Sequence, residues 1–426
     1  MDKQDTAILR ELAKVYAEQA AHPANEERRR RATDINELRP RRPLVHMDEI
    51  PWNEINVDGQ LTLRCTEPYA RDMELFFRRS LMRWKYFQAD HILEPIFLVR
   101  KSYESTGYGL EIKETVRVTD TANNIISHNY HDLLPDEEAL EQLHAPQMTL
   151  RPDLDERHMN DALDALHDVL PVRLAGALDY CYHAPWDLIP RLHGVNNVLM
   201  DLAAEPEFMH ATIRKFTEIM AEEIDQWEKL GLLDGGCTDL HCTPGQTETL
   251  PGDALHGGPG KTEGLWLRHM AQLFGSVSPE MYNEFDVEYV KPLAKRFGLV
   301  YWGCCEPLDN VLPYLESIPN LRKVGVSPWS DVEKCAERIG GRYVLSRKPN
   351  PANVSLHTDE AVVREEILST VRACEKYGCA CDYTLKDTSS CGYDLGNLVR
   401  WNDTVRDALD GIYGPVPTAD TKDLKF

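Results

Sequence analysis

The sequence predicts an α/β protein, a (β/α)8 barrel of the TIM type with an N-terminal helical and extended arm. Three observations support this fold. Helix-like and strand-like apolar patterns alternate along most of the 426 residues, and the strand–helix units number close to eight. No GxGxxG follows the first strand, and no GxxxxGK followed by Ser or Thr occurs, so the doubly wound nucleotide-binding folds lose support.

The chain divides into three predicted regions. Residues 1–70 form the arm, because a helical pattern over 5–20 is followed by a basic run and by extended segments with turns. Residues 71–412 form the barrel, with a hairpin insertion near 108–131, where polar and apolar residues alternate. Residues 413–426 are polar and form a loose tail.

The barrel elements follow from local patterns. The long helix near 205–231 opens with Pro206 and Glu207, which suit a first helical turn. The other predicted helices share apolar residues at helical spacing and lie at 70–88, 155–169, 279–297, 309–316, 331–338, 358–377 and 394–410. The predicted strands share short β-branched or aromatic runs and lie at 91–99, 172–177, 234–241 and in the segments FGLVYWGC, RKVGVS, RYVLS and CDYTLKD.

Composition limits the partners. The chain carries 47 basic and 70 acidic residues, a formal charge of −23, which argues against general binding to nucleic acid or anionic membranes. No apolar run approaches the ~18 residues of a membrane span, and the charged N-terminus lacks a signal-peptide core, so we expect a cytoplasmic protein. Eleven cysteines in such a chain indicate free thiols or metal ligands.

Active sites of such barrels lie at the carboxyl ends of the strands, so the residues there carry the chemistry. In the strand near 235, Cys237, Asp239 and His241 are expected to point to the same side. Asp239 and His241 are therefore candidate catalytic residues, and His241 is also a candidate metal ligand. The alternative is that both side chains only hydrogen-bond loop backbone.

The segment after FGLVYW supplies two thiols and a carboxylate, Cys304, Cys305 and Glu306. These donors suit zinc, which prefers sulfur, nitrogen and oxygen ligands. Cys391, after the last predicted strand, can close the same metal site. The alternative is that these cysteines are buried and act as small apolar side chains.

Other polar or aromatic residues near strand ends are candidate substrate-binding residues, namely Glu94, Gln272, Trp302, Trp329, Arg347 and Lys348. The two tryptophans can wall a flat ring. The Arg347–Lys348 pair suits a carboxylate or the rim of a corrinoid. The alternatives are salt bridges at the rim and plain aromatic packing.

Three segments, 193–220, 274–351 and 383–401, resemble the uroporphyrinogen decarboxylase-like superfamily, including SPEMYNEF at a helix start and YTLKDTSSCGYDLGNLVRW near the C-terminus. That superfamily contains the decarboxylase and corrinoid-dependent methyltransferases, and the resemblance implies a (β/α)8 barrel. The decarboxylase's arginine-rich loop and strand-end Phe-Ser-Asp are absent, and Glu94 lies near the expected catalytic aspartate. Porphyrinogen decarboxylation is therefore not expected.

The zinc methyltransferases of this superfamily carry His-x-Cys after the sixth strand and a distant Cys after the eighth. Here the matching segment is Trp302-Gly303-Cys304-Cys305-Glu306, without the histidine, and Cys391 matches the second cysteine. The resemblance implies that His241 or Glu306 replaces the missing ligand. The branch it indicates is that of the methyltransferase components of O-demethylases.

The sequence thus predicts a corrinoid-dependent methyltransferase that moves a methyl group from an O-methyl donor, such as a methoxylated aromatic, to cob(I)alamin on a corrinoid carrier protein. Asp239, His241 and Glu306 would act as catalytic acids or zinc ligands. The chain lacks the carrier motif Asp-x-His-x-x-Gly, so the corrinoid comes with a partner, and a homodimer is one expected assembly. Two alternatives are zinc-dependent methyl transfer from methyl-corrinoid to a thiol, and a non-catalytic tetrapyrrole- or corrinoid-binding barrel.

Overall fold

The computed structural model describes residues 1–118 and 126–426 and has a mixed α/β architecture. Seven strands of the described chain form one parallel sheet. Their order is β1 (Leu44–Met47), β13 (Ala380–Leu385), β12 (Val344–Arg347), β11 (Leu321–Val326), β10 (Leu299–Trp302), β9 (Trp266–His269) and β8 (Cys181–His183). Such a sheet with crossover helices is consistent with a TIM-type fold.

Three strand pairs lie outside the main sheet. The pair β2 (Phe97–Arg100) and β7 (Val172–Ala175) is parallel. The pairs β3 (Tyr103–Ser105) with β6 (Met148–Leu150) and β4 (Glu114–Val118) with β5 (Ile126–Tyr130) are antiparallel. The β4–β5 pair falls where the sequence predicted a hairpin near 108–131, of which residues 119–125 lie outside the described chain.

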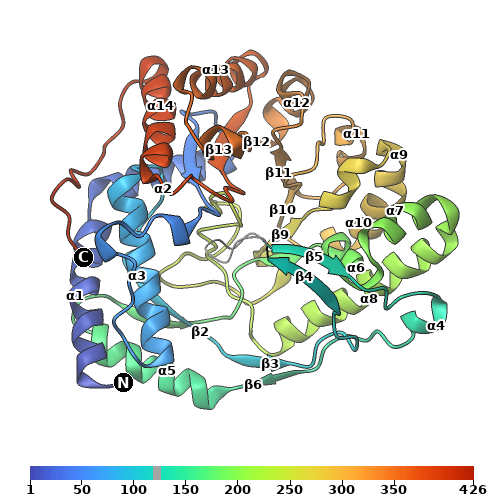
Figure 1. Cartoon of the computed structure of the whole chain (residues 1–426), viewed down its shortest axis with the longest axis horizontal. Helices are drawn as coiled ribbons and strands as arrows, with labels where there is room; N and C mark the ends of the chain where they lie inside the picture. The colour runs from blue at the N-terminus through green and yellow to red at the C-terminus, as the bar shows by residue number, and fades with distance from the viewer. Residues whose placement is uncertain (119–125) are drawn as a thin grey trace.

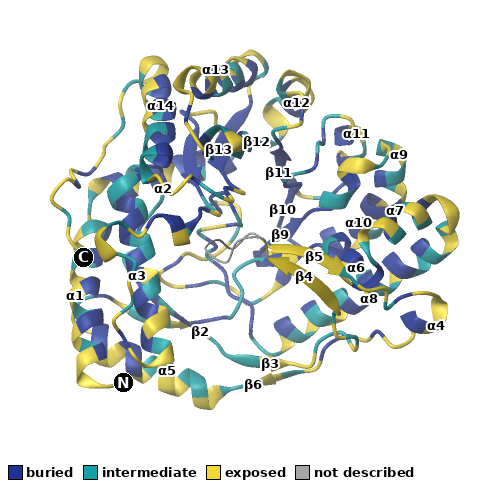
Figure 2. Ribbon diagram, in the orientation of Figure 1, coloured by how far each residue is buried: buried dark blue, intermediate teal, exposed yellow. Residues whose placement is uncertain are grey.

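Helices cover the outer face of the main sheet (Figure 1). Those that follow its strands are α6 (Pro185–His193), α7 (Val195–Ala204), α8 (Pro206–Lys229), α9 (Pro279–Tyr282), α10 (Glu288–Ala294), α11 (Leu312–Leu315), α12 (Val332–Ile339), α13 (Glu360–Tyr377) and α14 (Leu395–Tyr413). Between α9 and α10, residues Asn283–Val287 are π-helical. Figure 2 shows β10 and β11 buried while the outward sides of α12–α14 are exposed.

The remaining helices belong to the first 170 residues and are α1 (Lys3–Ala20), α2 (Pro23–Asn36), α3 (Pro68–Tyr86), α4 (Glu137–Leu140) and α5 (Pro152–Leu166). Helices α1, α3 and α5 share a core cluster that includes Leu9, Phe77 and Leu166. No helix in the described part of the chain combines the length and apolar content needed to cross a membrane.

Strand β1 lies within the segment for which the sequence predicted an arm. It pairs in parallel with β13, with Leu44 opposite Asp382 and Met47 opposite Leu385. The two residues after β1, Asp48 and Glu49, therefore lie at the same edge of the sheet as the residues after β13. This edge strand brings two carboxylates to the carboxyl ends of the strands.

The strand predicted at 234–241 is wrong. In its place residues 236–246 form an irregular hairpin, here called the central hairpin, with a single isolated antiparallel bridge between Asp239 and Pro244. Left-handed backbone at Gly236 (φ 80°), His241 (φ 42°) and Cys242 (φ 63°) is incompatible with a regular strand. Cys237, Asp239 and His241 consequently do not share one strand face.

Buried polar groups of the main sheet hold the central hairpin. Lys323 on β11 lies 2.9 Å from the Asp382 carboxylate on β13 and donates to Thr243 Oγ1 (2.8 Å) and the Pro244 carbonyl (3.0 Å). Thr243 Oγ1 also donates to Asp382 Oδ2 (2.9 Å). Because both charges are buried, each gains from being paired and hydrogen-bonded. The network fixes the hairpin whose tip carries His241 and Cys242.

Candidate functional site

Residues that follow β1, β10 and β13 meet at the carboxyl edge of the main sheet. The ammonium of Lys386 lies 3.1 Å from Cys304 Sγ, 3.3 Å from Cys305 Sγ, 2.7 Å from Asp387 Oδ2 and 3.3 Å from Glu49 Oε2. Together with the hairpin tip, these residues form what we call the strand-end cluster, which consists of Glu49, His241, Cys242, Cys304, Cys305, Lys386 and Asp387.

The cysteine pair holds a negative charge next to this ammonium. The pKa of Cys304 is held well below its usual range, mainly by a hydrogen bond from the Cys305 thiol. A hydrogen bond involving His241 and the positive charges of Arg268 and Lys386 act in the same direction, whereas burial opposes them. The same bond and burial raise the pKa of Cys305. The geometry therefore favours a thiolate at Cys304 and a thiol at Cys305, whose Sγ lies 2.8 Å from Asp387 Oδ2.

Three members of the cluster form a group that can hold a metal ion. One ligand atom from each of Glu49, His241 and Cys242 lies within 4.8 Å of the others, and His241 Nε2 is 3.8 Å from Glu49 Oε1. An oxygen, a nitrogen and a sulfur donor match the preferences of zinc. Burial raises the pKa of the Cys242 thiol, and a bound cation would deprotonate it.

The backbone at the cluster is strained. Four of its residues have backbone in the left-handed region, which residues with a Cβ rarely adopt. They are Glu49 (φ 46°), His241 (φ 42°), Cys242 (φ 63°) and Asp387 (φ 56°). Each such residue costs on the order of 1–3 kcal/mol and persists where surrounding structure holds it, most often at active sites. Strain at four residues that converge on one point supports a functional role for this point.

Glu306 lies beneath the cluster and is almost fully buried. Its carboxylate accepts hydrogen bonds from the backbone N–H of Cys304 (2.9 Å), from that of Ala271 (3.1 Å) and from Tyr282 Oη (3.3 Å). Burial and the Cys304 charge raise its pKa. In this arrangement Glu306 holds the Cys304 turn in place, and its oxygens are engaged by protein donors.

Cys391 lies apart from the other predicted metal ligands. Its backbone N–H donates to Glu54 Oε2 (2.7 Å), and its side chain packs in a core cluster with Met47, Leu385 and Trp401. Burial raises the pKa of its thiol. The structure thus brings His241, Cys304 and Cys305 together and leaves Cys391 outside the group.

Asp239 lies in the central hairpin two residues before His241. Burial, reinforced by the negative charge of Asp48, raises the pKa of its carboxyl to about 7. A carboxyl with such a pKa can give or take a proton near neutral pH, which suits the acid role predicted from the sequence.

A pocket of about 550 Å³ adjoins the cluster. Its wall includes the rings of Tyr108, Tyr130, Tyr182 and Trp227, so we call it the aromatic pocket. Tyr182 links the two places, because it lines the pocket and its ring centroid lies 5.5 Å from that of His241. A planar apolar ligand would find several rings to pack against.

Asp187 provides an acidic group in the aromatic pocket. Gln272, a predicted substrate-binding residue, donates to Asp187 Oδ2 (3.2 Å), and Tyr182 Oη lies 3.5 Å from the same oxygen. Burial is the main cause that raises the pKa of Asp187 to about 6, and the charge of Cys304 acts in the same direction. Asp187 therefore faces the cysteine site as well as the pocket.

Four other predicted substrate-binding residues occupy different surroundings. Trp302 is fully buried and packs on His269, with ring centroids 4.2 Å apart, whereas Trp329 is 71% exposed at the surface. Arg347 is buried against the Ser327 carbonyl and Glu366. Lys348 is buried beside the hairpin tip, where it donates to the Cys242 carbonyl (2.9 Å).

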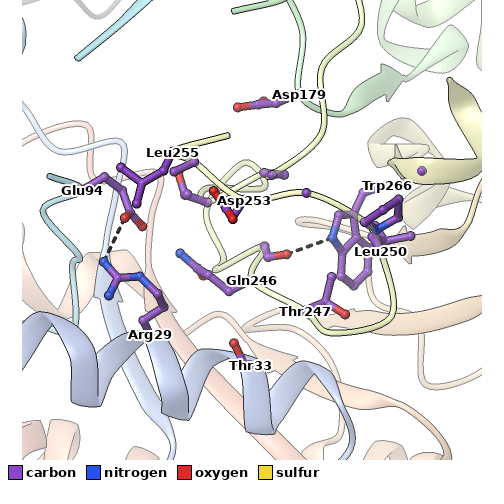
Figure 3. A pocket seen from close by; sticks show the side chains of 18 of the residues that line it. Arg29, Thr33, Glu94, Asp179, Gln246, Thr247, Leu250, Asp253, Leu255 and Trp266 are labelled. Atoms are coloured by element: carbon purple, nitrogen blue, oxygen red, sulfur yellow. Dashed lines mark hydrogen bonds and ion pairs between the residues drawn. The ribbon is translucent and has the colours of Figure 1, made fainter. Parts of the chain in front are cut away.

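Glu94 lies in a second pocket, of about 490 Å³, whose lining includes Cys237 but no residue of the strand-end cluster. Figure 3 shows its ion pair with Arg29 of α2 (2.9 Å) and the neighbouring Leu255, Asp253 and Gln246. This pocket is built from the base of the central hairpin and from Trp266, the first residue of β9. It therefore lies toward the amino end of the main sheet, whereas the strand-end cluster lies at the carboxyl end.

Several residues of the site were not predicted as site residues. Glu49 follows a four-residue strand that the sequence placed in an arm, and Cys242 is the immediate neighbour of His241. Lys386 and Asp387 stand directly after the strand pattern CDYTL, which was a usable signal. Asp187 carried no signal, because its importance depends on burial and on partners distant in sequence.

The fold and the site together define an α/β protein with a cysteine, histidine, carboxylate and lysine cluster at the ends of parallel strands. No family model matches the chain, and no curated protein matches it. Among solved structures, a methyltransferase from Methanosarcina mazei is similar with a TM-score of 0.49 and 12% sequence identity, covering 90% of this chain and 98% of that chain.

Proposed function

We propose that this protein is a methyltransferase that takes a methyl group from an O-methyl donor, of the methoxylated aromatic class, and passes it to the cobalt of a corrinoid carried by a partner protein. The observation that carries the proposal is the contact between two sites: Tyr182 and Asp187 belong to the aromatic pocket and also face the strand-end cluster. The superfamily resemblance of segments 274–351 and 383–401 supports the same reaction class.

The aromatic pocket is the proposed donor site. Its rings suit a planar ligand, and Arg191 in its wall suits a donor that carries a carboxylate. A phenoxide is a poor leaving group, so the ether oxygen needs a proton or a Lewis acid as the carbon–oxygen bond breaks. Asp187 is the proposed acid: its proton moves to the leaving oxygen, the methyl group moves to the acceptor, and Asp187 then regains a proton from solvent.

The strand-end cluster would support this step electrostatically. Burial raises the pKa of Asp187 and the thiolate of Cys304 acts in the same direction, so the carboxyl keeps its proton closer to neutral pH. Lys386 balances the thiolate and keeps it in place. Glu49, His241 and Cys242 are the residues that would hold zinc, which would act as a Lewis acid toward an oxygen or a sulfur of the bound substrate.

One observation favours the reverse type of reaction, in which methyl-corrinoid methylates an acceptor thiol. The cluster presents sulfur ligands and cations that favour a thiolate. In that reaction the donor pocket would be irrelevant, and the metal-capable group would hold the acceptor sulfur. The two reactions therefore depend on different residues.

The test is an anaerobic assay with reduced corrinoid, free or on a carrier protein, and a methoxylated benzoate. We expect formation of methyl-corrinoid together with one phenol, and a loss of at least about 100-fold in Asp187→Asn. Asp225→Asn, an exposed carboxylate paired with Arg296, is the matched control and should keep full activity. Methylation of an added thiol by methyl-corrinoid, without demethylation of any methoxyaromatic, would overturn the proposal in favour of the reverse reaction. Inactivity in both assays would favour a binding barrel.

A further inference from the structure

A chain of three buried side chains lies beside the aromatic pocket. His183 ends β8 and His269 ends β9, and the two residues are register partners in the parallel sheet. Their Nδ1 atoms are 3.0 Å apart. His269 Nε2 lies 3.0 and 3.1 Å from the two carboxyl oxygens of Asp286. None of the three side chains is more than 1% exposed.

A local irregularity in the helix after β9 positions Asp286. Residues Asn283–Val287 are π-helical between α9 and α10, and the indole of Trp186 donates to the Phe285 carbonyl in this turn (3.2 Å). A π-helical segment displaces side chains from their normal helical positions and is frequently found at functional sites. Here it places a carboxyl against the inner end of the histidine pair.

Hydrogen-bond rules allow only two arrangements of protons in this chain. The two facing Nδ1 atoms share one hydrogen, so the rings must be opposite tautomers when both are neutral. If Asp286 is protonated, it donates to His269 Nε2, His269 Nδ1–H donates to His183, and His183 carries a hydrogen on Nε2. If Asp286 is ionised, every bond reverses and His183 Nε2 is bare. The state of Asp286 therefore determines the state of His183 Nε2.

The surroundings keep both rings neutral. Burial lowers the pKa of His269 to about 3 and that of His183 well below its usual range, and it raises the pKa of Asp286. The charged groups that face His269 are the Glu306 carboxylate and the Arg268 guanidinium, with opposite effects. The phenol of Tyr282 on α9 faces Asp286, and the Trp302 ring covers His269. The proton is thus stored on the carboxyl.

The outer end of the chain belongs to a residue that lines the aromatic pocket. His183 is part of the wall of the aromatic pocket, and its Nε2 has no hydrogen-bond partner in the described part of the chain. A buried polar atom without a partner destabilises the fold, and a hydrogen bond to a ligand atom would satisfy it. Arg191 in the same wall favours an anionic group.

We propose that Asp286, His269 and His183 form a proton relay that delivers one proton to an anionic oxygen of a ligand in the aromatic pocket. The His183 Nε2–H proton passes to the ligand oxygen. His183 Nδ1 receives the Nδ1 proton of His269, and His269 Nε2 receives the carboxyl proton of Asp286. Asp286 is left ionised. It is protonated again when one proton enters at His183 Nε2 and the transfers through His269 run in the opposite direction. This inference does not depend on the proposed methyl transfer.

The first test observes the tautomers by nitrogen NMR of histidine-labelled full-length protein. We expect His183 to carry its hydrogen on Nε2 and His269 on Nδ1 while Asp286 is protonated. Both rings should switch tautomer together at one midpoint, above the usual pKa of an aspartate. Asp286→Asn should abolish the switch, whereas Glu284→Gln, an exposed neighbour in the same π-helical segment, should keep it. A positively charged ring, equal tautomers on both rings, or a switch that persists in Asp286→Asn would overturn the relay.

The second test uses 4-nitrophenolate as the ligand, because its colour reports its protonation. The pH is set just above the pKa of free 4-nitrophenol. Binding to the wild-type protein should then lower the fraction of dye in the coloured phenolate form at least about tenfold, compared with free dye at the same pH. The bound dye should stay coloured in Asp286→Asn and in His183→Gln, with Kd measured by calorimetry in each variant. Bleaching that survives both substitutions would overturn the role of the relay. Failure of the dye to bind the wild type would overturn the ligand class.

Discussion

The ammonium of Lys386 lies 3.1 Å from the sulfur of Cys304, although these residues follow strands β13 and β10, which are separated in the sheet by β12 and β11. In a flat sheet three strand spacings would place the two strand ends about 14 Å apart, beyond the reach of a lysine and a cysteine. The contact therefore requires a strongly curved sheet whose carboxyl ends converge.

The position of Lys386 divides the strand-end cluster into two parts. Lys386 lies against Cys304, Cys305, Asp387 and Glu49 and supplies the cation for that side. A second cation next to the same sulfurs would be repelled by the ammonium. The metal-capable group is instead formed by Glu49, His241 and Cys242, with Glu49 as the residue that belongs to both parts.

Removal of this ammonium should make the Cys304 thiolate less stable. In Lys386→Met the pKa of Cys304 should rise, because a favourable charge next to the sulfur is lost while the hydrogen bond from Cys305 remains. Thiolate absorbance followed over pH measures this shift, and Cys304→Ser identifies the signal. Lys386→Arg should keep most of the effect. An unchanged titration in Lys386→Met would show that Cys305 and His241 alone stabilise the charge.

Zinc binding should depend on the hairpin tip. We expect about one zinc per chain in protein purified without chelator, and less than about a tenth of that in His241→Ala or Cys242→Ser. Cys391→Ser is the matched control, because its thiol lies in a separate core cluster, and it should keep the metal. Retention of zinc in both hairpin variants, with loss in Cys391→Ser, would overturn the hairpin site. It would assign the metal to the other predicted ligands, Cys304, Cys305, Glu306 and Cys391, without His241.

The sequence predicted the α/β class and most elements of the second half of the chain, because each helix there has a clear apolar period and each strand is short and buried. It failed at 234–241, where alternating residues imitate a strand. Gly235 and Gly236 in that segment were a signal for a turn, since a Cβ on Gly236 would lie 2.3 Å from the backbone of Asp253.

The site was predicted in part. Cys304 and Cys305 were predicted because unusual side chains follow a recognisable strand pattern. His241 and Asp239 were predicted from a strand at 234–241 that the structure does not contain. Glu49 was missed because β1 has only four residues and lies far from the rest of the sheet in sequence. The relay through His183, His269 and Asp286 was not predicted, since its meaning comes from burial and from the partner of each ring nitrogen.

Glu306 should behave as a structural residue. Glu306→Gln keeps the size of the side chain but weakens the acceptors for the backbone N–H groups of Cys304 and Ala271, so the free energy of unfolding should fall by about 1–3 kcal/mol. Chemical denaturation measures the change, with Glu284→Gln as the control. A variant of full stability that has lost activity would instead support the catalytic role predicted from the sequence.

Asp187 should give the protein a distinct dependence of stability on pH. Its pKa is raised from an ordinary value of 3.8 to about 6, so the folded state binds more protons than the unfolded state between these values. The contribution of this group to stability is therefore fully present below its unfolded pKa and is lost as the pH rises through about 6. The lost contribution is up to about 3 kcal/mol, less whatever solvent screening removes at this partly accessible site. Urea unfolding of the wild type and of Asp187→Asn at several pH values measures the difference, and we expect the substitution to gain relative stability as the pH rises. A difference between the two proteins that is the same at every pH would show that Asp187 has an ordinary pKa, and the acid role proposed for it would then fail.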